Sequence, residues 1–243
     1  MLDAQSRQVR NHLLAGLTGA QRALLLPHLE PVDLRQRDVL EQPGEPIAHV
    51  HFPDAGLLSV IAVGSKGERV EVAAVGRDGM TGLAGLVGDD RSPYEAIVQL
   101  DGFGHRIAAG ALRAIAQADE GVRERLLRYG QAFAVQAAFT ALSNAPHPIE
   151  HRLARWLLIC QDRTGMDALP LTHEFLSLML GVRRAGVTVA IHELEGRGLI
   201  RATRGHVRVL SREGLIEAAQ GSYGLAEAEY VRLLGGRRGA GEG

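Results

Sequence analysis

The chain has 243 residues, of which 46% are hydrophobic, so it is long enough for one large domain or two ordinary ones. No apolar run approaches the ~20 residues of a membrane span, and the first residues lack the apolar stretch of a signal peptide. Cys160 is the only cysteine, which excludes intrachain disulfides and a metal cluster held by cysteines alone. These features predict a cytoplasmic protein.

The net charge of -1 is unevenly distributed along the chain. Residues 1–148 carry 14 basic against 17 acidic side chains, whereas residues 149–243 carry 13 against 11. The excess is concentrated in 181–212, where 7 Arg stand against 2 Glu, a net charge of +5. Such a segment is typical of a surface that meets phosphates, although a solvated charged face has the same composition.

The first third of the chain predicts short helices followed by a β-rich domain. Residues 1–16 and 20–29 have weak helical periodicity, and Thr18 is suited to cap the second helix. Short β-rich runs separated by Gly and Pro then predict a small barrel or jelly roll. The seven expected strands are 32–34, 38–40, 49–52, 57–63, 69–75, 95–100 and 103–107.

Glycine recurs at every third residue from Gly76 to Gly88. The run is too short and too poor in proline for collagen. It favours tight turns, with backbone amides approaching an anion as the alternative.

Residues 110–145 have a helical pattern with apolar or small residues at heptad spacing. The seam predicts either packing on the β-rich domain or, as we expect, pairing with a second copy of the chain. Its residues are Leu126, Tyr129, Phe133, Ala137 and Thr140. The break at 144–148 sets a domain boundary, and further helices are expected at 149–163, 212–219 and 226–234.

The segment 169–210 has the pattern of a winged helix-turn-helix. Thr172 is suited to cap a first helix, which Gly181 ends in a left-handed turn. A second helix carries Arg183 and Arg184 in its first turn. Two short β runs follow, joined by the basic tip 203–206, and complete the outline of helix, turn, helix and hairpin.

The motifs His51–Ser59, Val75–Met80 and Leu171–Ile200 make nearly the whole chain resemble one family of bacterial transcription factors. This is the cyclic-AMP receptor/fumarate-nitrate regulator (CRP/FNR) family. The resemblance implies an α+β fold with a cyclic-nucleotide-binding-like β-barrel of jelly-roll type and a long dimerisation helix. A winged helix-turn-helix would complete it. The implied boundaries are 1–109 for the sensing barrel, 110–146 for the helix, 147–220 for the DNA-binding domain and 221–243 for a C-terminal helix and flexible tail.

The resemblance further implies a homodimer that regulates transcription from a near-palindromic site on double-stranded DNA. RNA polymerase would be a further partner if the protein activates. In the family's second motif helix an Arg contacts guanine, and Arg184 matches it, whereas Ala185 replaces the acid or amide that follows. Arg184, Ala185 and Thr188 are therefore the expected base contacts. The expected phosphate contacts are Thr172, His173, Arg183, Arg201, Arg204 and His206.

The expected effector site has lost part of the family's phosphate cassette. Gly82 is followed by Leu83 in place of the glutamate that binds ribose, while Arg91 and Ser92 keep the phosphate pair. We therefore expect no cofactor, with a cyclic nucleotide as the alternative. Iron-sulfur members need four cysteines and are excluded.

Two other functions have partial support in the sequence. His147, Glu150 and His151 match the H-x-x-E-H pattern of some zinc proteases. A proline at the first helical position would leave His147 outside the helix, which removes the geometry of a metal site, so we expect neither a metal nor an enzyme. A sensor and dimerisation module that does not bind DNA is the second alternative, and the basic segment argues against it.

Overall fold

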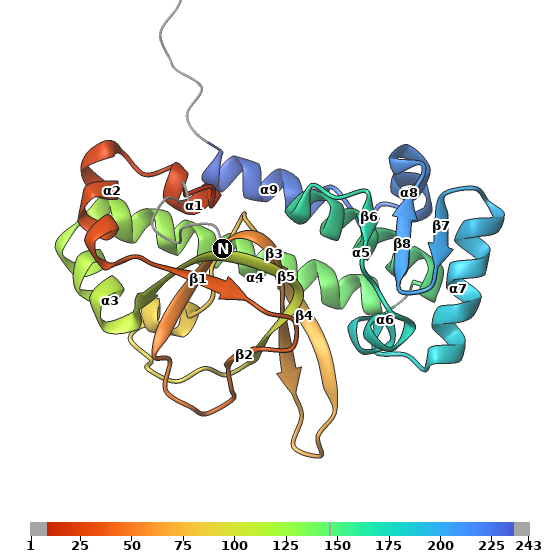
Figure 1. The fold of residues 1–243 in the computed structure, drawn as a ribbon, viewed down its shortest axis with the longest axis horizontal. Helices are drawn as coiled ribbons and strands as arrows, with labels where there is room; N and C mark the ends of the chain where they lie inside the picture. The colour runs from red at the N-terminus through yellow and green to blue at the C-terminus, as the bar shows by residue number, and fades with distance from the viewer. Residues whose placement is uncertain (1–8, 146, 236–243) are drawn as a thin grey trace, which may run out of the picture.

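The computed structural model describes residues 9–145 and 147–235. A sheet domain and a C-terminal domain lie at the two ends of the long helix α4 (Figure 1). The sheet domain contains α1 (His12–Ala15), α2 (Gly19–Leu25), the 3-10 turn η2 (Leu26–His28), β1 (Glu30–Leu34), β2 (Val39–Glu41), β3 (His49–Val63), β4 (Arg69–Val75), the 3-10 turn η3 (Leu83–Val87) and β5 (Glu95–Ala108). Then come α3 (Ala109–Ala118), α4 (Glu120–Asn144), α5 (Ile149–Thr164), β6 (Ala168–Leu169), α6 (His173–Leu180), α7 (Arg184–Gly196), β7 (Ile200–Thr203), β8 (His206–Val209), α8 (Arg212–Ala218) and α9 (Leu225–Leu234).

The N-terminal helices follow from local capping. The expected helix over 1–16 is helical at 12–15, and its residues 1–8 lie outside the described part of the chain. The expected cap is confirmed, because the Thr18 hydroxyl accepts a hydrogen bond from the Gln21 amide while the Gln21 side chain accepts one from the Thr18 amide. α2 ends one turn early, at Leu25, where the 3-10 turn η2 begins with Pro27 as its second residue.

The sheet contains five strands where seven short ones were predicted, because two pairs of the predicted strands are joined into the long strands β3 and β5. Its antiparallel order is β1-β5-β3-β4, with β2 also paired to β5. The predicted turn at 53–56 lies inside β3, and Gly102 lies inside β5. These residues bend paired strands: the register shifts there, and a Cβ at Gly102 would lie 2.1 Å from the Ala55 carbonyl oxygen. The described strands form a bent jelly-roll sheet that is not closed into a barrel.

Asp54, at the bend in β3, anchors the start of the described chain. Its carboxylate accepts hydrogen bonds from the backbone amides of Arg10 and Asn11, at 2.6 and 2.7 Å. The buried Asn11 side chain donates to the carbonyls of Pro53 and Gly79. A segment that looks like a loop in the sequence therefore holds α1 against the sheet.

The glycines that follow β4 allow close packing and tight turns. Of the two predicted roles, tight turns or the binding of an anion by backbone amides, the structure supports the first. A Cβ at Gly79 would lie 2.2 Å from the Tyr129 hydroxyl of α4. Gly82 and Gly88 bracket η3 with φ angles of 75° and 90°, which favour glycine.

The expected single helix over 110–145 is two helices, because Asp119 adopts an extended conformation and caps α4 through the Val122 amide. The heptad seam exists but faces the chain's own sheet domain. Leu126, Tyr129 and Phe133 are buried in that core, so this structure corrects their assignment to a dimer interface. Ala137 and Thr140 are partly buried on the same side.

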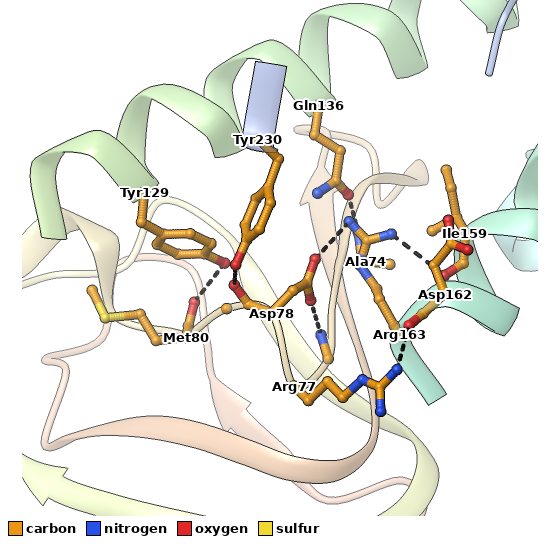
Figure 2. Close-up of polar contacts among 12 residues, drawn as sticks. Ala74, Arg77, Asp78, Met80, Tyr129, Gln136, Ile159, Asp162, Arg163 and Tyr230 are labelled. Atoms are coloured by element: carbon orange, nitrogen blue, oxygen red, sulfur yellow. Dashed lines mark hydrogen bonds and ion pairs between the residues drawn. The ribbon is translucent and has the colours of Figure 1, made fainter. Parts of the chain in front are cut away.

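A buried polar joint connects the sheet domain, α4, α5 and α9 (Figure 2). The Arg163 guanidinium of α5 pairs with the Asp78 carboxylate at 3.2 Å, and the Tyr230 hydroxyl of α9 donates to the Asp78 carbonyl at 2.6 Å. From α4, the Tyr129 hydroxyl donates to the Met80 carbonyl. The C-terminal helix therefore returns to the sheet domain rather than continuing the DNA-binding domain.

The two domains also share an apolar core. Leu57, Ala74 and Leu100 of the sheet belong to the same buried cluster as the interior of α5, α6 and α7. At this junction the Trp156 indole donates to the buried Glu71 carboxyl at 2.8 Å.

No single helix among the described residues is long and apolar enough to cross a membrane; α6 and α7 pass that test only together, as a pair bent by 102°.

Candidate nucleic-acid interface

The two helices of the predicted helix-turn-helix form as expected. The Thr172 hydroxyl caps α6 by accepting from the Phe175 amide at 3.2 Å. Gly181, with a φ of 62°, ends α6 in the left-handed conformation, so its replacement by a larger residue would strain the turn. α7 then leaves at 102° to α6, within the range of helix-turn-helix motifs.

One face of α7 is fixed by burial. Val187, Ala190, Ile191 and Leu194 lie in the core against α5 and α6. Their spacing is that of a single helical stripe. The opposite face of α7 must therefore face outward.

The outward face of α7 carries the predicted base contacts and two residues that sequence analysis missed. Arg184 and Ala185 are exposed, and Thr188 is partly exposed. Val189 and His192 are exposed on the same side. Val189 is 64% exposed, an apolar group suited to a thymine methyl. The sequence could have indicated Val189, because it follows Ala185 by four residues and does not belong to the buried stripe of α7.

Polar contacts within the motif hold two of the predicted groups. Arg184 forms an ion pair with Glu174 at 3.0 Å, and both side chains are largely exposed. The Thr188 hydroxyl donates to the Arg184 carbonyl, so it accepts from the Nδ1–H of His173, 3.1 Å away. The weak, exposed Arg184 pair can exchange for a base contact. Thr188, in contrast, presents mainly its methyl group.

The wing presents a basic surface beside α7. β7 and β8 form a hairpin closed by Gly205, and β6 pairs with the other edge of β8. The predicted Arg201, Arg204 and His206 are exposed. Arg208, which sequence analysis missed, is also exposed and lies directly opposite Arg201. Because like charges opposite each other on a sheet repel, a polyanion would stabilise this arrangement.

The zinc-site alternative has no supporting geometry. Pro148 lies at the N-cap of α5, one residue before the first helical position that was predicted for it, and His147 lies before the helix with its ring against that of His151. Within residues 9–145 and 147–235, no group of three His, Cys, Asp or Glu is arranged to hold a metal ion.

The predicted effector residues are brought together only in part. Leu83 and Ser92 line a cavity of about 480 Å³ between η3 and α4, and Gly82 adjoins it. Arg91 does not line this cavity, because its guanidinium donates to the Gly44 carbonyl and is largely exposed. Glu41, a residue that sequence analysis did not single out, holds both Gly82 and Ser92.

Together, the jelly-roll domain, the long helix and the basic winged motif define a two-domain DNA-binding protein of the helix-turn-helix class. Residues 151–218 match the sequence model of the Crp-like helix-turn-helix domain family. No curated protein sequence matches the chain.

Solved structures share the fold over most of the chain. FixK2 from Bradyrhizobium japonicum matches with a TM-score of 0.68 and 18% identity, covering 78% of this chain and 96% of that one. TTHA1359, a CRP/FNR family transcriptional regulator from Thermus thermophilus, matches with a TM-score of 0.63 and 24% identity, covering 79% and 100%. The c-di-GMP responsive global regulator CLP from Xanthomonas campestris matches with a TM-score of 0.66 and 16% identity, covering 80% and 100%.

Residues 151–218 carry a Crp-like helix-turn-helix domain, as the resemblance seen in the sequence implied, and the rest of the chain shares the fold of these solved structures.

Proposed function

We propose that this protein regulates transcription as a homodimer that reads a near-palindromic DNA site through α7. The observation that carries the proposal is the outward face of α7, where Arg184, Ala185 and Val189 are exposed beside the arginines of the wing. An exposed helix beside a basic hairpin suits major-groove insertion with phosphate contacts on the flank.

A second face of α4 supports the homodimer. Next to the buried seam, α4 has a second row of exposed residues that recur at alternating intervals of four and three. These residues are Leu127, Gln131, Ala134, Ala138 and Ala141. This is the heptad spacing of a helix that pairs with a copy of itself, and the alanines permit close approach. The two copies of α7 would then reach half-sites about one helical turn apart, roughly 34 Å.

The proposed control is a small effector in the cavity between η3 and α4. The cavity size is within the range of small-molecule sites, and Leu127 and Gln131 of the proposed dimer face also line it. A ligand there would touch the helix that pairs the two chains. RNA polymerase is the further partner if the regulator activates.

The decisive experiment is selection of DNA from a random library by the full chain, together with its oligomeric state by analytical ultracentrifugation. We expect an inverted repeat and a dimer. Ala134→Glu, on the proposed dimer face, should give a monomer whose DNA affinity falls by at least ~10-fold, because it loses the second half-site. Ala114→Glu makes the same change on the exposed surface of α3 and serves as the control.

A single half-site sequence, or a dimer unaffected by Ala134→Glu, would contradict the dimer proposal. Absence of any enriched DNA would favour the alternative of a module that senses and pairs without binding DNA.

A further inference from the structure

The cavity between η3 and α4 combines an apolar lining with two acidic side chains. Most of its lining residues are apolar. Its charged lining residues are Glu41 and Asp89, and no Lys, Arg or His lines it among the residues that the structure describes. The electrostatic character of the cavity is therefore negative.

The groups that would hold an anion are already occupied by Glu41. One oxygen of its carboxylate accepts from the Gly82 amide at 2.6 Å, and the other accepts from the Ser92 hydroxyl at 2.6 Å. Ser92 is buried and Glu41 is partly buried, so the contact is shielded from water. A phosphate at this position would have to displace the carboxylate or lie beside it, and like charges at that distance repel.

We propose that this cavity binds an apolar small molecule that carries a positive charge or a strong hydrogen-bond donor, and that the Glu41 carboxylate recognises the polar end. Glu41 acts as an internal substitute for the phosphate of a nucleotide and so excludes nucleotides. Ligand binding by this cavity does not depend on the proposed function. Only the role of the ligand as an effector of transcription rests on it.

The apolar end of the ligand would lie against η3 and α4. Leu83, Leu86 and Tyr94 form one wall, and Leu127 and Phe133 form the other. Gly130 lies between the two α4 residues, and a Cβ built on it meets no atom within 4 Å. A side chain at this position would enter open space rather than strain the helix.

The test uses the purified full chain and two probes with the same ring system, 1-naphthylmethylamine and 1-naphthylacetate, with binding followed by calorimetry. We expect the amine to bind about 10- to 100-fold more tightly than the acetate, the range of a hydrogen bond to a charged group. Cyclic AMP and inorganic phosphate should show no binding.

Two variants assign the binding to the cavity. Glu41→Gln removes the charge and should abolish the preference for the amine, whereas Glu45→Gln, an exposed change just outside the cavity, should keep it. Gly130→Leu fills the cavity from a helical position that tolerates leucine and should abolish binding of both probes.

Tighter binding of the acetate or of cyclic AMP to the wild type, or no binding of the amine, would overturn the proposal. An unchanged preference in Glu41→Gln would overturn it as well. DNA binding without probes is measured in the same preparations, so that failure of the DNA-binding function is distinguished from failure of the ligand proposal.

Discussion

In the proposed function, base recognition at the start of α7 depends most on Arg184. Its guanidinium can donate two parallel hydrogen bonds to a guanine edge, which neither Ala185 nor Val189 can do. In the free protein it pairs with Glu174, but both side chains are mostly exposed, so the pair adds little stability. Specificity and stability are therefore separable at this position.

Arg184→Ala should lower the affinity for the selected DNA site by roughly 1–3 kcal/mol and relax the preference at one base position per half-site. Glu174→Gln should instead raise the affinity slightly, because it frees the arginine. Affinities on a panel of single-base variants check both changes, with Arg35→Ala, an exposed change in the sheet domain, as the control. Equal discrimination by Arg184→Ala and wild type would refute the assignment.

Glu71 is a buried carboxylic acid at the junction between the two domains. Desolvation raises the pKa of its carboxyl from the ordinary 4.5 to about 7, and hydrogen bonds from neighbouring side chains, Trp156 among them, lower it only in part. One carboxyl oxygen accepts from the indole, and the other has no hydrogen-bond partner within the described residues. The folded chain therefore holds a proton here that the unfolded chain releases.

The stability of the protein should fall as the pH rises between about 4.5 and 7 through this group. Below that range both states are protonated, and above it both are ionised, so the loss reaches a limit of at most about 3 kcal/mol. Glu71→Gln keeps an acceptor for Trp156 and should remove this part of the pH dependence. Denaturation at several pH values checks it against Glu217→Gln, an exposed change.

If Glu71→Gln and wild type lose stability in parallel from pH 5 to 8, the Glu71 carboxyl does not carry the effect.

In the proposed function, the wing contacts DNA through its charge alone. Arg201 and Arg208 face each other across β7 and β8, while Arg204 lies at the tip. None of these exposed side chains has an ion pair within the described part of the chain, so their charge is available to DNA phosphates.

Arg204→Ala should weaken binding to all DNA sequences by a similar factor, because a phosphate contact carries no base information. The slope of log affinity against log salt should fall by about 0.9 per contact, and therefore by about 2 for a dimer. Binding measured across a salt series to the selected site and to unrelated DNA checks this. A loss confined to the selected site would show that Arg204 reads bases.

The elements also show how far the sequence predicts this structure. The caps at Thr18 and Thr172 and the left-handed turn at Gly181 were predictable, because each depends on neighbouring residues alone. The strand count was not, because Gly56 and Gly102 mark turns in the sequence but bend paired strands in the fold.

The face of α4 was the harder prediction. Two heptad stripes lie on this helix, and the more apolar one, with Leu126 and Phe133, is the better sequence candidate for a dimer. Which stripe faces the sheet is a tertiary property, and the sheet takes the apolar one. For the same reason Glu41, 51 residues before Ser92, could not be placed beside the proposed effector cavity from local pattern.

At the scale of the whole molecule, α9 connects the two functional halves. It follows the DNA-binding domain in sequence, but Leu234 is buried in the core of the sheet domain and Tyr230 bonds to the turn after β4. Together with the shared apolar core, this predicts that the domains unfold as one unit and that the position of α7 is fixed relative to the sheet (Figure 1).

Leu234→Ala should lower the free energy of unfolding by about 2–3 kcal/mol. The same substitution in a buried helix in the middle of a chain could cost more, because α9 lies near the end of the described chain and its undocking limits the loss. For a chain of this size the thermal midpoint should fall by roughly 5–10 °C. Leu225→Ala changes a residue of the same helix that is 60% exposed, and it should shift the midpoint by little. Hydrogen exchange should become faster in α9 and in the facing part of α4 only in the Leu234 variant.

If exchange in α4 stays as slow as in the wild type, α9 covers this helix without stabilising it, and the coupling between the domains depends on the core around Leu57 and Leu100 alone.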